Sequence, residues 1–293
     1  MNILVTGASG FIGDSLCPAL ETAGHRVIPL RRGAGPGPTW NLSANLIDLS
    51  AAPSLDAVVH LAGENVGARW TASRKRRIRE SRVGGTRLLS EALAKFSSPP
   101  RVLICASATG FYGNRADEWL DESSASGSGF LAEVCREWEA AAAPAAAAGI
   151  RVVHLRFGIV LARHGGALAK MLPAFRLGLG GRLGDGRQYW SWIALDDAVA
   201  VVMHALKDDT IHGPVNAVSP RPATNRDFTQ SLARALHRPA FFAMPRFAVS
   251  LLFGEMGREA LLGSCRVGPA KLLASGFTFR HPELAPLLWE LLG

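Results

Sequence analysis

The chain has 293 residues, of which 48% are hydrophobic, so it is long and apolar enough to bury a large α/β core. No apolar run approaches the roughly 18–20 residues that cross a bilayer, and the N-terminal segment lacks the basic flank and cleavage site of a secretion signal. Four scattered cysteines show no metal-ligand spacing, which predicts neither a disulfide framework nor a metal site. We therefore expect a cytoplasmic protein with no membrane partner, and the net charge of +8 raises the question of nucleic-acid binding.

The first feature along the chain is a short apolar run at 2–6 that leads into three closely spaced glycines, Gly7, Gly10 and Gly13. The run fits a buried parallel strand, and helical periodicity follows over 11–20. Glycine at such a joint permits a tight turn at Gly7, approach of backbone N–H groups to a pyrophosphate at Gly10, and close packing of the helix at Gly13. The pattern predicts a dinucleotide-binding turn, with an ordinary strand-to-helix turn as the alternative.

Two arginines, Arg31 and Arg32, follow the second predicted strand, 26–30. In dinucleotide-binding folds an acidic residue here bonds the ribose 2′-hydroxyl of NAD, whereas arginine accommodates the 2′-phosphate of NADP. Because guanidinium groups bind phosphate with paired hydrogen bonds, the sequence predicts NADP(H), unless both arginines are merely solvent-exposed. The Gly-rich stretch 34–45 is predicted to be a loop, and Asp48 either meets the adenine or only caps a loop.

The strand predicted at 57–61 ends in His60-Leu-Ala-Gly-Glu64. Small residues at this place let the backbone pass close to the ribose and phosphates of a cofactor. Glu64 then places a carboxylate near the reacting centre, where it acts as a general acid or base or only caps the following segment.

A basic cluster follows at 74–79, on a predicted helix. No stacking aromatic residues are interleaved with it, and Glu80 comes directly after it. A solvated helix face explains the cluster better than a nucleic-acid site, so we expect no nucleic-acid partner.

Strands and helices alternate at a spacing suited to repeated βαβ units, which predicts a Rossmann-type doubly wound parallel sheet with its ligand crevice at the carboxyl ends of the strands. Residues 1–160 are expected to form the dinucleotide-binding domain, with its sheet completed by parts of 187–220. Residues 161–186 and 221–293 are expected to form a smaller, partly helical substrate lobe, with a C-terminal helical piece from about residue 245. The predicted strands are 2–6, 26–30, 57–61, 101–106 and 151–155, and the predicted helices 12–23, 72–94, 130–148 and 196–206.

Four segments of the chain resemble the extended short-chain dehydrogenase/reductases, namely Thr6-Gly-Ala-Ser-Gly-Phe-Ile-Gly13, His60-Leu-Ala-Gly63, Val83-Gly-Gly-Thr86 and Tyr112-Gly113. Further segments resemble the atypical NAD-dependent epimerase/dehydratase-like "epimerase family protein" subfamily, which has an extra C-terminal domain of undefined function. These include Arg69-Trp70, Arg156-Phe-Gly-Ile-Val-Leu161, Gly165-Gly-Ala-Leu168, Ser191-Trp-Ile193 and Gly254-Glu-Met256.

The resemblance implies a set of cofactor contacts. It places the pyrophosphate at Gly7, Ser9, Gly10, Phe11, Ile12 and Gly13. It places the 2′-phosphate at Arg31 and Arg32, and the cofactor ribose at Leu61, Ala62 and Gly63. Arg82 and Phe157 are also implied to contact the cofactor. A homodimer is one option that related enzymes suggest.

The catalytic pair of the characterised extended enzymes, a Tyr and a Lys four residues later on one helix, has no counterpart here. Four residues beyond the two tyrosines, Tyr112 and Tyr189, stand Ala116 and Ile193. Aligning Glu139 with the acidic residue that commonly follows the lysine puts Leu131 and Cys135 at the Tyr and Lys positions. The usual partner serine is also open, because Ser107 and Thr109 both lie near its expected place.

Two functions therefore compete. One is an NADP(H)-dependent oxidoreductase or epimerase-like enzyme acting on an unknown small molecule, with Glu64, Ser107, Tyr112 or a residue of the substrate lobe as its proton donor. The other is a regulatory or interaction protein that binds NADPH with little or no catalysis.

Overall fold

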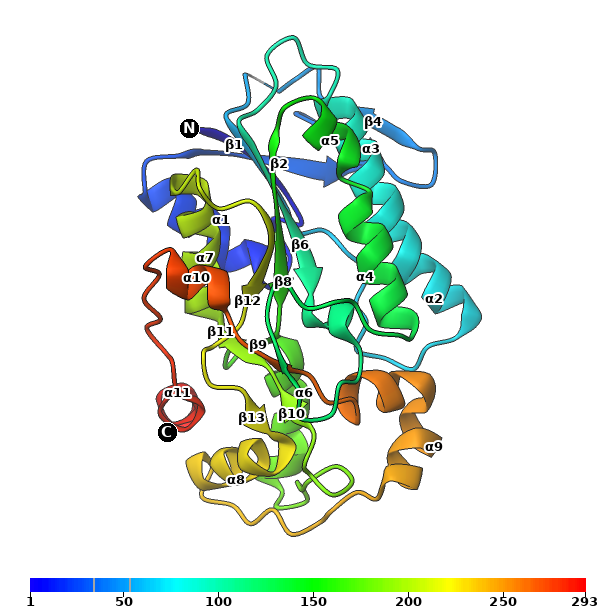
Figure 1. Cartoon of the computed structure of the whole chain (residues 1–293), viewed down its shortest axis with the longest axis vertical. Helices are drawn as coiled ribbons and strands as arrows, with labels where there is room; N and C mark the ends of the chain where they lie inside the picture. Colours follow the sequence, from blue (N-terminus) through cyan, green and yellow to red (C-terminus); the bar gives the residue numbers. More distant parts are fainter. Residues whose placement is uncertain (34, 53) are drawn as a thin grey trace.

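The computed structural model describes residues 1–33, 35–52 and 54–293 and contains a main sheet of eight strands in the order β12-β8-β6-β5-β1-β2-β3-β4 (Figure 1). All neighbouring strands are parallel except β3 and β4, which are antiparallel. This arrangement confirms the predicted doubly wound sheet. The strands are β1 (Asn2–Thr6), β2 (Arg26–Arg32), β3 (Thr39–Asn41), β4 (Leu46–Asp48), β5 (Ala57–His60), β6 (Val102–Ala108), β8 (Arg151–Phe157) and β12 (Gly213–Ala217).

Helices cover both faces of this sheet (Figure 1). On one side lie α1 (Gly13–Thr22) and α7 (Leu195–Lys207), and on the other α2 (Ala72–Arg79), α3 (Gly85–Leu93), α4 (Phe130–Ala140) and α5 (Ala143–Ala147). Successive side chains of β1 enter different cores, because they point to opposite faces. Ile3 and Val5 pack with residues of α1 and α7, whereas Leu4 packs with residues of α3 and α5. Burial on both faces explains why the strands read as continuous apolar runs.

A smaller lobe packs beyond the carboxyl ends of the strands, around α6 (Gly166–Arg176), α8 (Asn225–Ala235) and α11 (Leu284–Leu292). Trp190 and Trp192 lie in its core. Three short strand pairs join the lobe to the rest: β9 (Ile159–Leu161) with β11 (Trp192–Ala194), β10 (Tyr189–Trp190) with β13 (Ala223–Thr224), and β7 (Trp119–Leu120) with β14 (Arg266–Val267). The remaining helices are α9 (Arg246–Met256) and α10 (Ala270–Ala274), with a 3₁₀ turn at Thr109–Tyr112 and a π-helical turn at Gly257–Leu261.

The structure differs from the predicted elements at three places. The single helix expected at 72–94 is interrupted by a π-helical turn at Glu80–Gly84. The helix expected at 130–148 divides into α4 and α5 because Pro144 lacks the N–H that a continuous helix needs. The stretch 34–45 is not all loop, because β3 lies within it; Ala34 itself is outside the described residues. Among the described helices none is both long and apolar enough to cross a membrane.

Candidate functional site

The glycine-rich turn joins β1 to α1 and packs against the end of β5. Gly7 has a φ of +69°, and a β-carbon there would lie 2.9 Å from the Ala62 backbone nitrogen. A β-carbon at Gly13 would overlap the Gly7 carbonyl oxygen. No described side chain caps α1. Within the described residues the N–H groups of Phe11, Ile12 and Gly13 donate to no protein acceptor and can face an anion, whereas Gly10 donates to the Gly7 carbonyl and Asp14 to the Gly10 carbonyl. Ser9 and Gly10 are exposed at the turn, and Ile12 precedes the helix.

A contact from the lobe reaches the same turn. A β-carbon at Gly165 would lie 2.8 Å from Cδ2 of Phe11, and one at Gly166 would lie 2.7 Å from its Cε1. The glycine pair therefore lets the start of α6 sit against the phenylalanine ring. Sequence analysis singled out these glycines only as part of a family resemblance, since adjacent glycines are equally common in loops that contact nothing.

Arg31 and Arg32 lie at the carboxyl end of β2, opposite Thr39 and Trp40 of β3. Both are exposed, and neither forms an ion pair with another described residue. Asp48 ends β4, where its carboxylate accepts hydrogen bonds from the backbone N–H and the hydroxyl of Ser50, at 2.9 and 2.6 Å. These bonds lower the pKa of Asp48 and give it a local role as a turn cap.

A buried polar chain runs under the turn and holds the end of β5. Nδ1 of His60 lies 2.6 Å from the Thr6 hydroxyl, and its Nε2 lies 2.9 Å from the Thr86 hydroxyl. Thr6 also accepts a hydrogen bond from the Ala62 N–H, and Thr86 accepts one from the Trp138 indole. Burial, assisted by the charge of Arg82, lowers the pKa of His60 to about 4, so the ring is neutral. These linked hydrogen bonds hold the backbone that follows β5, at 61–63. The sequence of the His60 motif did not predict this role.

Arg82 supports the same backbone from the π-helical turn. Its guanidinium donates a hydrogen bond of 2.9 Å to the Glu64 carbonyl and lies 5.0 Å from the centre of the Trp138 ring. A β-carbon at Gly63 would lie 3.2 Å from the Arg82 Cζ. Extra residues inserted as a π-turn often occur at functional sites, because they re-aim a side chain without ending the helix. Periodicity alone did not predict this insertion.

Ion pairs largely neutralise the basic cluster at 74–79. One Glu64 carboxylate oxygen lies 3.8 Å from both Arg74 and Arg77, and the Glu64 side chain is 34% exposed. Lys75 pairs with Glu255 of α9 at 2.8 Å, and Arg79 pairs with two glutamates of α4. The cluster therefore belongs to the protein's own packing; the sequence predicted a solvated helix face but not these ion pairs.

Ser107 and Tyr112 belong to a buried network around the ion pair of Arg156 and Glu139. Nε and Nη2 of Arg156 each donate to one oxygen of the Glu139 carboxylate at 2.8 Å, and Ser107 donates to the same carboxylate at 2.7 Å. The Tyr112 hydroxyl accepts from Arg156 and donates to Asn216. Tyr112 is fully buried, and desolvation raises its pKa to about 12. Two of the three predicted proton donors thus have their polar atoms engaged within the protein.

The positions of the usual Tyr and Lys on α4 hold Leu131 and Cys135. Leu131 packs against Gly110. A β-carbon at Gly110 would lie 3.2 Å from the Cβ of Leu131. Cys135 is buried, which raises the pKa of its thiol to about 12. The carboxylate of Glu259, from the C-terminal segment, accepts hydrogen bonds from the backbone N–H groups of Phe130 and Leu131, at 3.0 and 3.1 Å. The C-terminal segment therefore caps α4 at Leu131, the position that the catalytic tyrosine occupies in the characterised enzymes.

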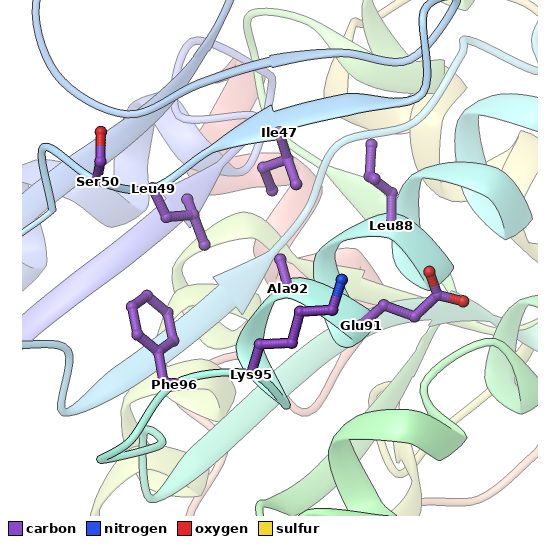
Figure 2. Close-up of a pocket in the computed structure, with 8 residues that line it drawn as sticks. All are labelled: Ile47, Leu49, Ser50, Leu88, Glu91, Ala92, Lys95 and Phe96. Atoms are coloured by element: carbon purple, nitrogen blue, oxygen red, sulfur yellow. The ribbon is translucent and has the colours of Figure 1, made fainter.

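Only some of the predicted site residues lie together in the structure. The carboxyl ends of β1, β5, β6 and β8 share one edge of the parallel sheet. That edge brings together Gly7, the backbone at 61–63, Ser107 and Phe157, which lies opposite Ala108. A groove of about 310 Å³ lies elsewhere, between β4 and α3, lined by Ile47, Leu49, Leu88, Phe96, Glu91 and Lys95 among others (Figure 2). A second hollow of about 210 Å³ borders Arg31, Pro29 and Pro38. Because the larger groove touches none of the predicted site residues, the shared edge defines the candidate site.

This edge, with its glycine turn at a helix N-terminus, defines a Rossmann-type dinucleotide-binding protein of the extended short-chain dehydrogenase/reductase class. Residues 3–217 match the sequence profile of the NAD dependent epimerase/dehydratase family, and residues 244–291 match a domain of unknown function, DUF1731. The chain belongs to the NAD dependent epimerase/dehydratase family.

Similar proteins extend over the whole chain. Epimerase family protein ML0860 of Mycobacterium leprae is 40% identical over 290 residues, covering 98% of this chain and 94% of the relative. Human epimerase family protein SDR39U1 is 38% identical over 296 residues, covering 99% of each. A crystal structure of human SDR39U1 (isoform 2) with NADPH superimposes with a TM-score of 0.89 at 36% identity, covering 99% of each chain.

Proposed function

We propose that this chain binds NADP(H) along the carboxyl edge of its sheet and acts as an unusual oxidoreductase or epimerase-like enzyme on a small molecule. The observation that carries the proposal is the glycine turn, whose Gly7 leaves room for the backbone of Ala62 while the N–H groups at 11–13 donate to no described acceptor. The human relative's crystal structure contains NADPH, which supports the same cofactor here.

The residues present fit NADP(H). Backbone N–H groups at 11–13 would hold the pyrophosphate, with Gly7, Ser9 and Gly10 shaping the turn, and the backbone at 61–63 would line the ribose. Arg31 and Arg32, exposed and free of ion pairs within the described chain, would hold the 2′-phosphate. Arg82 and Phe157 are the remaining proposed contacts, whereas Asp48, whose carboxylate is hydrogen-bonded to Ser50, is proposed as a turn cap. Bound NADPH supplies hydride, and the chain's own task is to hold the cofactor and to manage one proton.

Cofactor choice is tested by measuring NADPH and NADH affinity for the Arg31→Ala/Arg32→Ala double variant. We expect NADPH affinity to fall by about 10- to 100-fold with NADH affinity little changed, because charge-assisted hydrogen bonds contribute roughly 1.5–3 kcal/mol. Arg26→Ala, at the opposite end of β2, is the matched control. An equal loss for both cofactors would contradict the assigned role of the two arginines.

Among the three predicted proton donors, Glu64 is the one with a partly exposed carboxylate, so we propose it as the acid or base, with Ser107 and Tyr112 in supporting positions. Residues 161–186 and 221–293 are the proposed substrate lobe, and the cytoplasm is the proposed location. Glu64→Gln should abolish turnover while NADPH binding persists, and Glu80→Gln on the neighbouring turn should leave both intact. Unchanged turnover in Glu64→Gln would remove it from the mechanism.

A second candidate is a regulatory or interaction protein that binds NADPH without consuming it. The apolar Leu131 and Cys135 at the usual Tyr and Lys positions favour it, together with the burial of Tyr112. It predicts stoichiometric NADPH binding and no NADPH oxidation across a panel of carbonyl compounds and nucleotide sugars. One efficiently converted substrate would exclude it.

A further inference from the structure

Most of the large apolar side chains that are exposed in the described residues gather at one end of the lobe. They lie in the turn after α6, in the segment between α8 and α9, and on α9. We call this surface the lobe tip, and define it by Leu177, Leu179, Phe241, Phe242, Phe247 and Leu251. In Figure 1 the segment between α8 and α9 runs along the end of the molecule opposite α5.

Backbone contacts hold the segments of the lobe tip together. The Met244 N–H donates to the Arg182 carbonyl, and the Gly184 N–H donates to the Met244 carbonyl, each at 2.8 Å. Phe247 and Leu251 are four residues apart on α9 and therefore share one face of the helix. Phe241 is 85% exposed and the adjacent Phe242 is 62% exposed. The tip is thus an apolar surface built from several exposed side chains, whereas exposed apolar residues on ordinary surfaces occur singly.

Two longer segments that contain the lobe tip hold most of the chain's excess positive charge. Residues 166–184 and 228–254 contain six of its 32 Lys and Arg residues and none of its 24 Asp and Glu residues, which leaves 26 basic against 24 acidic residues elsewhere. All six are exposed, and none forms an ion pair with another described residue. They are Lys170, Arg176, Arg182, Arg234, Arg238 and Arg246.

This combination selects among partners. Four of the six, Arg176, Arg182, Arg238 and Arg246, adjoin the tip segments, and Asp185 is the acidic residue beside Arg246. In a two-fold dimer through this face, these four positive charges would meet four more with a single acidic group on each side. Phenylalanine and leucine side chains surrounded by arginine instead match the boundary between lipid headgroups and acyl chains. Two adjacent exposed phenylalanines on one connecting segment suit insertion among lipids, while arginines attract anionic headgroups.

We propose that the lobe tip docks on the surface of an anionic membrane, with Phe241 and Phe242 inserted and Arg238 and Arg246 beside lipid phosphates. The expectation of no membrane partner rested on the absence of a spanning segment, which surface docking does not need. The apolar and basic residues come from segments more than forty positions apart, so they meet only in the folded lobe. The proposal is independent of the reaction that the cofactor site supports.

Co-sedimentation of the full chain with NADPH tests it, using phosphatidylcholine vesicles with and without phosphatidylglycerol. We expect salt-sensitive binding to the anionic vesicles only. Phe241→Ser/Phe242→Ser should abolish it, and Leu46→Ser, an exposed apolar residue on β4 at the other end of the molecule, should not. Arg238→Gln and Arg246→Gln should each weaken binding by about fivefold. Unchanged circular dichroism and NADPH affinity establish that the variants are folded.

Three outcomes would overturn the proposal. The first is no binding to anionic vesicles. The second is binding that survives loss of both phenylalanines. The third is a concentration-dependent dimer, seen by analytical ultracentrifugation without vesicle binding and dissolved by Phe241→Ser/Phe242→Ser, which would assign the tip to a second copy of the chain.

Discussion

The two halves of the crevice edge use their polar groups in different ways. At β1, β2 and β5, the N–H groups of residues 11–13 and the exposed Arg31 and Arg32 have no partner within the described residues, and the polar groups beneath them serve to fix the backbone. At β6 and β8, Ser107, Tyr112 and Arg156 are bound to one another and to Glu139 in a buried network. One half offers groups to a ligand, whereas the other uses its polar groups for its own stability. Binding and proton transfer therefore have separate structural requirements in this chain.

The largest expected effect comes from breaking the buried ion pair. Arg156→Met should lower the free energy of unfolding by about 3–5 kcal/mol, because it leaves the Glu139 carboxylate buried without its partner. Urea unfolding measures the loss. Replacing both partners, as Arg156→Met/Glu139→Leu, should recover much of it. If Arg156→Met is as stable as the unsubstituted protein but has lost turnover, the ion pair takes part in the reaction and does not serve stability.

The neutral His60 makes stability depend on pH. Its pKa is lowered from 6.5 to about 4 in the folded chain, so the unfolded chain binds a proton first as the pH falls. The stabilisation, about 3 kcal/mol, should be complete above pH 6.5 and lost as the pH falls toward 4. As the pH falls across this range, the urea midpoint should decrease less steeply for His60→Gln than for the unsubstituted protein. The control variant His164→Gln, at an exposed histidine, should behave like the unsubstituted protein.

Glycine substitution tests the binding half directly. Gly13→Ala should cost about 1–3 kcal/mol of stability and weaken NADPH binding, because its β-carbon would overlap the Gly7 carbonyl oxygen. Gly84→Ala is the matched control, because no heavy atom lies within 4 Å of a β-carbon there. Thermal unfolding and cofactor titration measure both effects. Normal binding by Gly13→Ala would show that the turn tolerates a shift and is less constrained than its packing indicates.

The smallest expected effect concerns the link from the C-terminal segment to α4. Glu259→Ala removes the acceptor for the Phe130 and Leu131 N–H groups, and the loss of such a cap typically costs about 1 kcal/mol. Differential scanning calorimetry should show a small decrease in Tm, with NADPH affinity nearly unchanged. A large loss of turnover with unchanged Tm would instead give the C-terminal segment a direct part in the chemistry.

Sequence reasoning identified the sheet and most of its strands, because a parallel strand buried on both faces is a continuous apolar run. It missed β3 and β4, which have three residues each and too little pattern to recognise. It located Gly7, Gly13, Arg31 and Ser107 near the crevice, yet it did not identify the bonds of Ser107 and Tyr112 to the Arg156 and Glu139 pair. Those bonds join residues 32 and 44 positions apart, and no local spacing encodes them.

By itself, the sequence determined the glycine turn, the positions of the sheet's main strands along the chain and the absence of a Tyr-x-x-x-Lys pair, since these depend on local backbone conformation and on residue identity. Only the tertiary structure decided which charges remain free. It neutralised most of the dense cluster at 74–79 with glutamates from three other elements, and it gathered four scattered basic residues at the lobe tip, where Asp185 is the acidic residue beside Arg246. The physical reason is that ion pairing depends on distance in space, which the fold sets, and not on distance along the chain.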